Sequence, residues 1–400
     1  MTLLDELKNE MKTNRQFWNY YDVKFEDVFE NEEAARDFII KYFQNGSKLS
    51  VLKEWKKITN DYMNRRNIHT VNVFFIGAYL QRHIDENIEI KSEQSSNYTF
   101  SYLWYLLCLA HDLGYVYENE SQSYLAIPND NVNNTRKMYK EACRLRTKWY
   151  QDLGIGILNR AKPFCDIWIP LNRESYDINP YNNFIEYNNG TIVKKCRYSQ
   201  RIKNNYFNYR IYEMNTLDHG IIGADYFYSK MLHNYKLEYL KTVRHGNLIG
   251  DYYSFYNEDG HSFCIEQLKI FAYIADCIAS HNIFMANNEQ TQRDKYMKYG
   301  LENLLQENFI KISYEDNPLL FVLCVADTIE PSKRFPSYGN EEILELLSIG
   351  FDKSRNLLYV EIDEELFNSD EGIRYISGIE ELEEWCDINV NVQTKDFRVN

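Results

Sequence analysis

No stretch of this 400-residue chain approaches the roughly 18 consecutive apolar residues that a membrane-spanning helix needs. The N-terminus also lacks a basic start followed by an apolar core, so the sequence predicts neither secretion nor a membrane anchor. The eight cysteines form no Cys-x-x-Cys pair, and several lie in apolar helical runs, as reduced core cysteines do. We therefore expect a cytoplasmic protein that does not contact a membrane.

Positive charge is also scarce, because 45 Lys and Arg face 59 Asp and Glu, a net charge of −14. This balance excludes a chain-wide basic surface for nucleic acid. Residues 136–210 depart from it, with 15 basic against 6 acidic side chains. They predict a surface for an anionic substrate or a nucleic acid, although a solvated helix face explains them equally well. Residues 337–400 are acidic, with 16 Asp and Glu against 5 Lys and Arg. This region would suit docking of a protein partner, homo-oligomerisation or stabilisation of the main domain.

The length exceeds that of one compact domain, so we expect a main domain with an appendage. Helical apolar periodicity predicts a mainly α protein. Residues 1–60 would form a helical segment that packs on the core, and residues 61–336 the main domain. From residue 337 the pattern changes to the strand-like segments ILELLSIGF, NLLYVEID and INVNVQT, with a helix at GIRYISGIEELEEW. Residues 337–400 therefore predict a small α/β appendage.

An insertion of the main domain is predicted at about 116–210. The 106 residues between Asp112 and His219 include turn-rich pieces and the helix-like stretch RKMYKEACRLRTKWYQDL. In IEYNNGTIVKKCRY, Asn-Gly stands between alternating apolar residues, which predicts a β-hairpin.

The stretch Ser101–Tyr115, SYLWYLLCLAHDLGY, is the centre of the functional prediction. Its apolar run of about three turns predicts a buried helix that ends at His111 and Asp112. Burying an imidazole and a carboxylate is costly unless something pairs with them. A metal ion would do so, and so would a simple hydrogen bond that closes the helix.

Four more candidate ligands lie beside apolar helical runs, in RRNIHTVNVFFIGAYL, TLDHGIIGADYFYSKML, FAYIADCIASHN and LLFVLCVAD. They are His69, His219, His281 and Asp327. Imidazole with carboxylate suits Fe, Mn, Co, Ni or Zn. The recurrence of this setting favours a metal site over an isolated helix-closing pair.

The order His…His-Asp…His…His…Asp resembles that of the HD-superfamily metal-dependent phosphohydrolases. RNIHTVNV is similar to their first-histidine helix, and LCLAHDLGY to the motif that names them. VADTIEPSKR is similar to the last-aspartate helix of small bacterial HD hydrolases that cleave diadenosine tetraphosphate. DHGIIGA and ASHN resemble the dinuclear branch, which includes cyclic-dinucleotide phosphodiesterases and the HD nucleases of CRISPR systems. These motifs cover roughly a quarter of the chain, in order.

The resemblance implies an HD-domain helical core with two divalent metal ions, of Mn, Fe, Co, Ni, Zn or Mg. It also implies a metal-activated hydroxide that attacks a phosphoester or phosphoanhydride. The first ion would be held by His69, His111, Asp112 and Asp327. The second would be held by His219 and His281, with Asp112 bridging the two ions. Arg66, His111 and Asp112 would be the catalytic residues.

Other charged residues have two readings each. Arg66 matches a superfamily position and would contact phosphate, or form a surface salt bridge. Lys333 and Arg334 follow the last aspartate and would bind an anionic substrate, or occupy a solvated turn. Asp218 would orient the histidine that follows it, or cap the next helix.

Two positions depart from the dinuclear branch. Tyr115 stands where HD-GYP-type phosphodiesterases usually carry Lys. Asn282 stands where those enzymes and the CRISPR nucleases commonly have a second histidine after the one matched by His281.

Three functions follow. We expect first a phosphohydrolase or phosphodiesterase acting on a nucleotide or another phosphorylated small molecule. The alternatives are an HD nuclease on single-stranded DNA or RNA, with 136–210 as the backbone track, and a nucleotide-sensing regulatory module with the HD fold.

Overall fold

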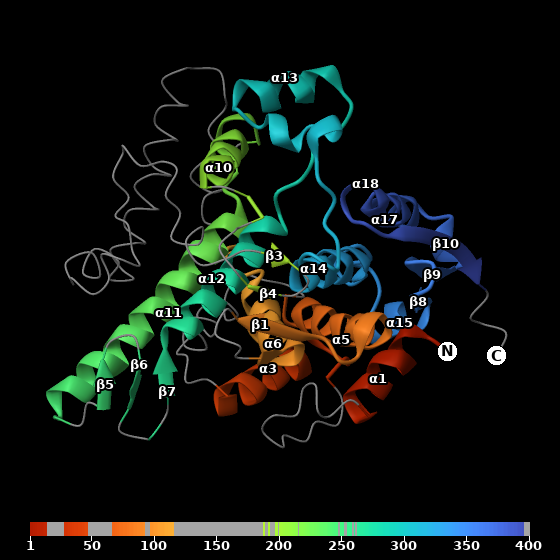
Figure 1. The fold of residues 1–400 in the computed structure, drawn as a ribbon. Helices are drawn as coiled ribbons and strands as arrows, with labels where there is room; N and C mark the ends of the chain where they lie inside the picture. The colour runs from red at the N-terminus through yellow and green to blue at the C-terminus, as the bar shows by residue number, and fades with distance from the viewer. Residues whose placement is uncertain are drawn as a thin grey trace. The chain divides into compact units, whose positions relative to one another are not determined.

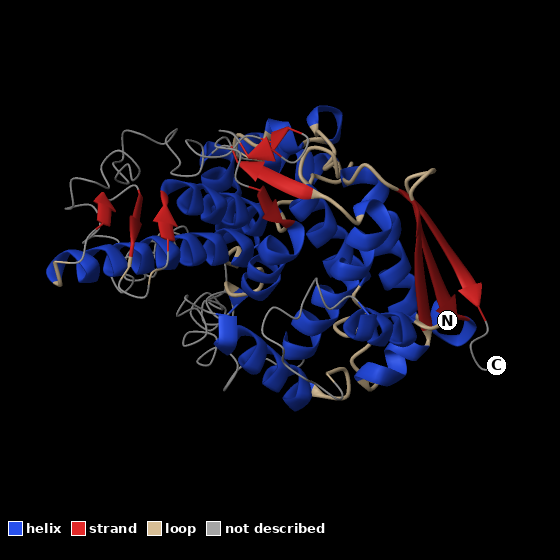
Figure 2. Cartoon of the chain, turned by 60° about the horizontal axis from the view of Figure 1, so that its bottom comes forward, coloured by secondary structure: helices blue, strands red, loops and turns tan. Residues whose placement is uncertain are grey.

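The structure of the chain is a computed structural model. It describes residues 1–13, 28–46, 66–92, 97–115, 187–188, 191–192, 197–198, 200–214, 216–246, 249–251, 254–257, 260 and 262–395. Most of the predicted insertion, including its predicted helix, lies outside these residues. The described residues are mostly helical with small sheets, which confirms the predicted class (Figures 1 and 2). Among the described helices, none has the length and apolar content needed to cross a bilayer.

The chain forms two compact units. The first unit comprises Met1–Ile90, Tyr98–Leu109 and Ile310–Asn400. The second unit comprises Lys91–Asn97 and Ala110–Phe309. The chain therefore passes from the first unit to the second directly before His111, and the residues of the predicted appendage belong to the same unit as the helix that carries His69.

The first unit is built around helix α5 (Arg66–Asp85), which is buried over most of its length. A helix that is apolar on every side belongs in a core. Helices α1 (Leu3–Thr13), α3 (Glu32–Gly46) and α14 (Pro318–Ile329) pack on it. Helix α14 begins at a strong start signal, because Asn317 accepts a hydrogen bond from Leu320 N and proline follows it.

Helix α6 (Phe100–Ala110) contacts α5 through Trp104, whose ring occupies the space that a side chain at Gly77 would take. A Cβ at Gly77 would lie 2.0 Å from the ring of Trp104 on α6. The Trp104 indole also donates a hydrogen bond to Phe74 O at 3.0 Å. The buried helix predicted for Ser101–Tyr115 is thus anchored on α5.

The C-terminal part of the first unit is a three-stranded sheet with short helices (Figure 2). Strand β9 (Leu357–Asp363) pairs antiparallel with β8 (Leu347–Asp352) and parallel with β10 (Asn389–Lys395). The helices are α15 (Asn340–Glu345), α16 (Glu364–Phe367), α17 (Asp370–Glu380) and α18 (Leu382–Trp385). The strand predictions are correct except at the start of ILELLSIGF, which ends helix α15. Tyr79 of α5 donates to Ile349 O of β8 at 3.2 Å, so this sheet packs on the α5 core.

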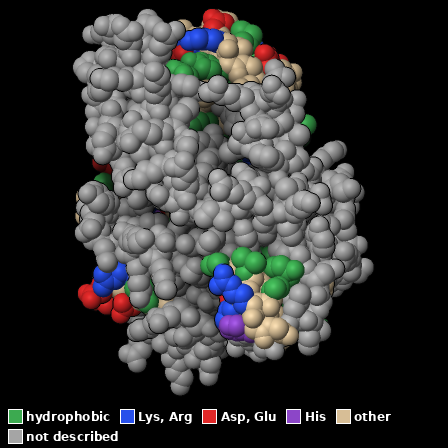
Figure 3. All heavy atoms as spheres, turned by 90° about the vertical axis from the view of Figure 1, so that its left-hand side faces the viewer, with side chains coloured by type: hydrophobic (Ala, Val, Ile, Leu, Met, Phe, Trp, Pro, Cys, Tyr) green, Lys and Arg blue, Asp and Glu red, His purple; other side chains and the backbone are tan. Residues whose placement is uncertain are grey.

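The second unit contains α10 (Gln200–Met214), α11 (His219–Arg244), α12 (Ile265–Ser280) and α13 (Gln290–Lys298), with 3₁₀ turns η3 (Glu302–Leu304) and η4 (Gln306–Asn308). Helices α11 and α12 pack against each other (Figure 1). An antiparallel sheet is formed by β5 (Ile249–Asp251), β6 (Ser254–Tyr256) and β7 (Ser262–Cys264). In the sequence, these strands lie between α11 and α12. Leu240 and Arg244 are exposed near the end of α11. Figure 3 shows apolar and basic side chains beside each other on this side of the molecule.

The hairpin predicted at the Asn-Gly pair is confirmed. Strands β3 (Tyr187–Asn188) and β4 (Thr191–Ile192) pair antiparallel around it. Strand β1 (Glu89–Ser92) adds to β4 in parallel, and β2 (Asn97–Thr99) completes this small sheet.

Candidate metal centre

Two of the predicted ligands meet in the first unit. His69 lies in the first turn of α5, and Asp327 lies in the last turn of α14. His69 Nε2 is 3.0 Å from Asp327 Oδ1, with the imidazole fully buried and the carboxylate 29% exposed. Packing of α14 on α5 therefore joins ligands from opposite ends of the predicted main domain.

A second carboxylate holds the other nitrogen of this imidazole. Glu330, which directly follows α14, is buried, and its Oε2 lies 2.7 Å from His69 Nδ1. An ionised carboxylate only accepts hydrogen bonds, so it places the imidazole proton on Nδ1. Nε2 and Asp327 Oδ1 then face each other as two acceptors, which a proton or a cation must bridge. The 3.0 Å separation suits an Nε2–H hydrogen bond to Asp327, and it also suits two ligands at right angles on one ion, each about 2.1 Å from that ion.

Glu330 is itself held by other buried groups. Its Oε1 accepts from Asn72 Nδ2 at 2.7 Å and from Ser332 N at 2.9 Å. Burial alone would raise the pKa of Glu330, but the His69 imidazole and these hydrogen bonds lower it. For His69, burial and the Lys333 ammonium oppose the charged form, and the carboxylates of Glu330 and Asp327 outweigh them, so its pKa is raised. Glu330 is not among the residues predicted for the site from the sequence. An acidic residue at the end of a buried helix was the available signal.

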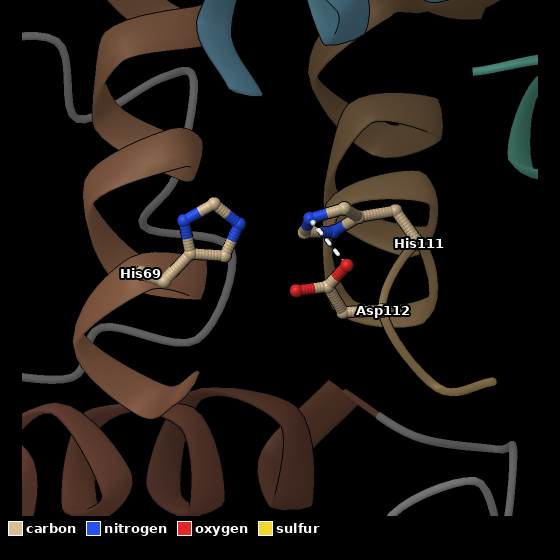
Figure 4. A group of neighbouring side chains, drawn as sticks. All are labelled: His69, His111 and Asp112. Carbon is tan, nitrogen blue, oxygen red and sulfur yellow. Dashed lines mark ion pairs between the residues drawn. The ribbon is translucent and has the colours of Figure 1, made fainter. Parts of the chain in front are cut away.

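The His-Asp pair lies where the chain leaves α6. Figure 4 shows His69 on α5, and His111 and Asp112 after α6 with their contact dashed. His111 Nε2 is 3.5 Å from Asp112 Oδ1, and both side chains are buried. The turn is closed by backbone hydrogen bonds from Leu113 N to Ala110 O and from Tyr115 N to Asp112 O, both at 3.1 Å.

Three predicted ligands converge in the second unit. His219 is the first residue of α11, His281 caps the end of α12, and each offers a nitrogen to a group with Asp112. The three ligand atoms lie within 4.8 Å of one another, and all three side chains are buried. His219 Nε2 is 3.9 Å from Asp112 Oδ1. Such distances exceed hydrogen bonds and suit donors on one ion, which lie about 3.0 to 4.2 Å apart.

The tautomer of His281 also fits a ligand. Its Nδ1–H donates to Ile278 O at 2.6 Å, which leaves the lone pair of Nε2 for a metal. The His281 ring stands edge-on to those of His111 and His219, with centroids 5.7 and 5.4 Å apart.

Glycine permits the close packing around this group. A Cβ at Gly114 would lie 1.8 Å from His219 O, and one at Gly220 would lie 2.9 Å from Ile278 O. The turn after α6, the start of α11 and the end of α12 therefore approach at backbone distance. The glycines that follow His-Asp and His219 in the sequence are required by this geometry.

Asp218 caps α11, which confirms one of its two readings. Its Oδ1 accepts from Ile221 N at 2.7 Å. Its Oδ2 accepts from Asn282 Nδ2 at 2.7 Å, and the same amide nitrogen lies 3.4 Å from His219 Nδ1. Asp218 thus reaches the imidazole of His219 through Asn282, whereas its other predicted role was to orient that imidazole directly. The Tyr115 ring stacks on His219 at 3.7 Å.

The basic candidates differ in their surroundings. Lys333 Nζ is 3.8 Å from Asp327 Oδ1, beside the first pair of ligands. Arg334 is exposed in the turn after α14, and Arg66 is half-buried at the start of α5. In the described part of residues 136–210, Lys203 is buried in an ion pair with Asp276 at 2.5 Å, so its charge is already compensated.

These donors are imidazole and carboxylate, which suit borderline and hard divalent cations such as Mn, Fe, Co, Ni or Zn. Buried His and Asp groups that could hold metal ions are therefore present in the chain. No family model matches the chain, and neither a curated protein nor a solved structure matches it significantly.

Proposed function

We propose that this chain is a dinuclear metal-dependent phosphohydrolase or phosphodiesterase of the HD type that acts on a nucleotide. The observation that carries the proposal is the buried group of Asp112, His219 and His281, whose ligand atoms lie within 4.8 Å. The 3.0 Å pair of His69 and Asp327 supplies further donors. These side chains have the same residue types, in the same order along the chain, as the metal ligands of the HD superfamily that the sequence resembles.

Chain continuity supports a shared role for His69 and His111. On α6, the Cys108 thiol donates to Thr70 O at 3.4 Å, and Thr70 is the neighbour of His69 on α5. His111 follows Cys108 by three residues. Along the chain, the His-Asp pair thus follows closely after a residue that contacts the neighbour of the first histidine.

Bound divalent ions would supply Lewis-acid activation of water and neutralise charge on a phosphoryl group. The chain's own residues orient the reacting groups. The Ile278 carbonyl sets the tautomer of His281. Lys333, beside Asp327, provides a positive charge for a phosphate oxygen. Burial of the imidazoles keeps bulk water from competing for these contacts.

The first experiment measures metal content by elemental analysis in wild type, Asp112→Ala and Asp363→Asn. Asp363 is a buried carboxylate that caps α16 and serves as the matched control. We expect about two ions per wild-type chain and per Asp363→Asn chain, and nearly none in Asp112→Ala. Wild type that stays empty after reconstitution with Mn²⁺ or Fe²⁺ would contradict the proposal.

A hydrolysis screen of cyclic and phosphoanhydride-linked nucleotides then tests the reaction. If the chain is instead a nuclease, we expect it to cleave single-stranded oligonucleotides. Its affinity for them should fall steeply with salt concentration, because each neutralised phosphate releases counterions. Metal binding without turnover of any phosphoester would favour the regulatory module.

A further inference from the structure

A continuous line of buried hydrogen bonds runs through the first unit and ends at His69. Asn340 donates to Phe29 O at 2.7 Å, and Asn72 donates to Asn340 Oδ1 at 2.8 Å. Asn72 also donates to Glu330 Oε1 at 2.7 Å, and Glu330 Oε2 meets His69 Nδ1 at 2.7 Å. Every side chain in the line is at least nine-tenths buried.

Such a line is costly to bury unless each polar group finds a partner. The Glu330 carboxylate meets that condition, with one oxygen on His69 and the other shared by Asn72 and Ser332 N. The preceding backbone is fixed as well, because the Tyr375 hydroxyl donates to Ile329 O at 2.5 Å. The position of Glu330 is thus determined from several elements at once.

We propose that Glu330 is a positioning residue that holds the His69 imidazole as its Nδ1–H tautomer, so that Nε2 is presented beside Asp327 to a divalent ion. Asn72 and Asn340 hold Glu330 in turn. The identity of the ion rests on the proposed function, whereas the orientation of the imidazole does not. Through Asn340 and Tyr375, residues of the acidic C-terminal region support a metal ligand.

A purely structural ion pair between α5 and α14 would leave metal affinity unaffected and lower only the stability of the fold. The discriminating variant is Glu330→Gln, which keeps the size and an acceptor oxygen and removes the charge. Asp363→Asn removes a buried carboxylate from the same unit, one that accepts a hydrogen bond from Glu365 N at the start of α16. Asn72→Ala removes one donor to Glu330 and leaves the carboxylate in place.

Metal affinity is measured by Mn²⁺ titration against a competing chelator. We expect Glu330→Gln to weaken one of two ions by about 10- to 100-fold and leave the other unchanged. Asn72→Ala should act in the same direction by a smaller factor, which keeps the test valid if Glu330→Gln does not fold. Asp363→Asn should bind both ions as wild type does. Wild-type affinity in both Glu330→Gln and Asn72→Ala, or an equal loss in Asp363→Asn, would overturn the inference.

The tautomer is read separately by ¹⁵N NMR of histidine-labelled, metal-free protein, with the pH raised until the His69 signal stops titrating, because the carboxylates of Glu330 and Asp327 raise the pKa of this imidazole. His69→Gln assigns the signal. We expect an Nδ1–H imidazole in wild type and a mixture of tautomers in Glu330→Gln. An Nε2–H imidazole in wild type would refute the inference. A chain that binds no metal but shows the expected tautomer would refute the proposed function alone.

Discussion

The two units present their ligands in different ways. In the first unit, one imidazole lies between two carboxylates, with contacts of 2.7 and 3.0 Å. In the second unit, imidazoles surround the single carboxylate of Asp112 at 3.5 and 3.9 Å. The first group is held by a side-chain hydrogen-bond network. The second is positioned mainly by backbone, through helix ends and glycines.

This difference implies different responses to metal. In the first group each imidazole nitrogen lies within hydrogen-bonding distance of a carboxylate, and Lys333 stands beside Asp327, so these side chains have charged partners within the first unit. The second has nitrogen and oxygen donors spaced for an ion rather than for one another. We therefore expect the second group to depend more on bound metal for its order.

Removal of metal should produce the largest effect. A metal ion whose free concentration is 1,000 times its dissociation constant raises the free energy of unfolding by about 4 kcal/mol. A chelator should therefore lower the unfolding temperature markedly. Hydrogen exchange should rise more at the start of α11 and the end of α12 than at the start of α5. Equal increases in the two regions would contradict the comparison.

Gly114→Ala should come next. Its Cβ would lie 1.8 Å from His219 O, so the backbone of the second group must move, at about 1 to 3 kcal/mol. We expect a lower free energy of unfolding in urea and a loss of metal. Gly350→Ala, where a Cβ would meet nothing within 4 Å, is the control and should keep its metal. Full metal content in Gly114→Ala would show that backbone contact is not what positions His219.

Asn282→Ala should have a smaller effect. It removes the amide that joins Asp218 to His219 and leaves the cap of α11 intact. We expect about 10-fold weaker binding of one ion in a chelator titration. Asn257→Ala removes an amide that donates to Glu238, away from the ligands, and should bind metal normally. An unchanged affinity in Asn282→Ala would leave only the backbone to orient this group.

The smallest expected effect is a gain. Gly378 lies inside α17, and a Cβ there meets nothing within 4 Å, so Gly378→Ala should stabilise the first unit by about 0.5 to 1 kcal/mol. Chemical denaturation measures the gain. Metal affinity should not change, because the added methyl group meets no atom within 4 Å and so leaves the His69 group undisturbed. A changed affinity would show that general stability, rather than the hydrogen-bond line, governs this group.

The local sequence was informative where an apolar helix ends in a polar or charged residue whose burial costs free energy. His111, His281 and Asp327 were found in that way, since burial of a charged or polar side chain in such a run demands a partner. Periodicity likewise predicted the buried α6 and the strands β9 and β10. Periodicity did not separate the short helix α15 from the strand that follows it, because a short apolar run fits both the helical and the strand periodicity.

The residue types, their order and their helical settings were determined by the sequence itself, because burial cost and periodicity are properties of neighbouring residues. The orientation of the imidazoles was decided by tertiary structure alone. Glu330 meets His69 across 261 positions, and Asn282 meets Asp218 across 64. Such partners are chosen by the packing of α14 on α5 and of α11 on α12. Hydrogen bonds between side chains that are distant in sequence produce no periodic pattern of residues, so a single sequence does not predict them.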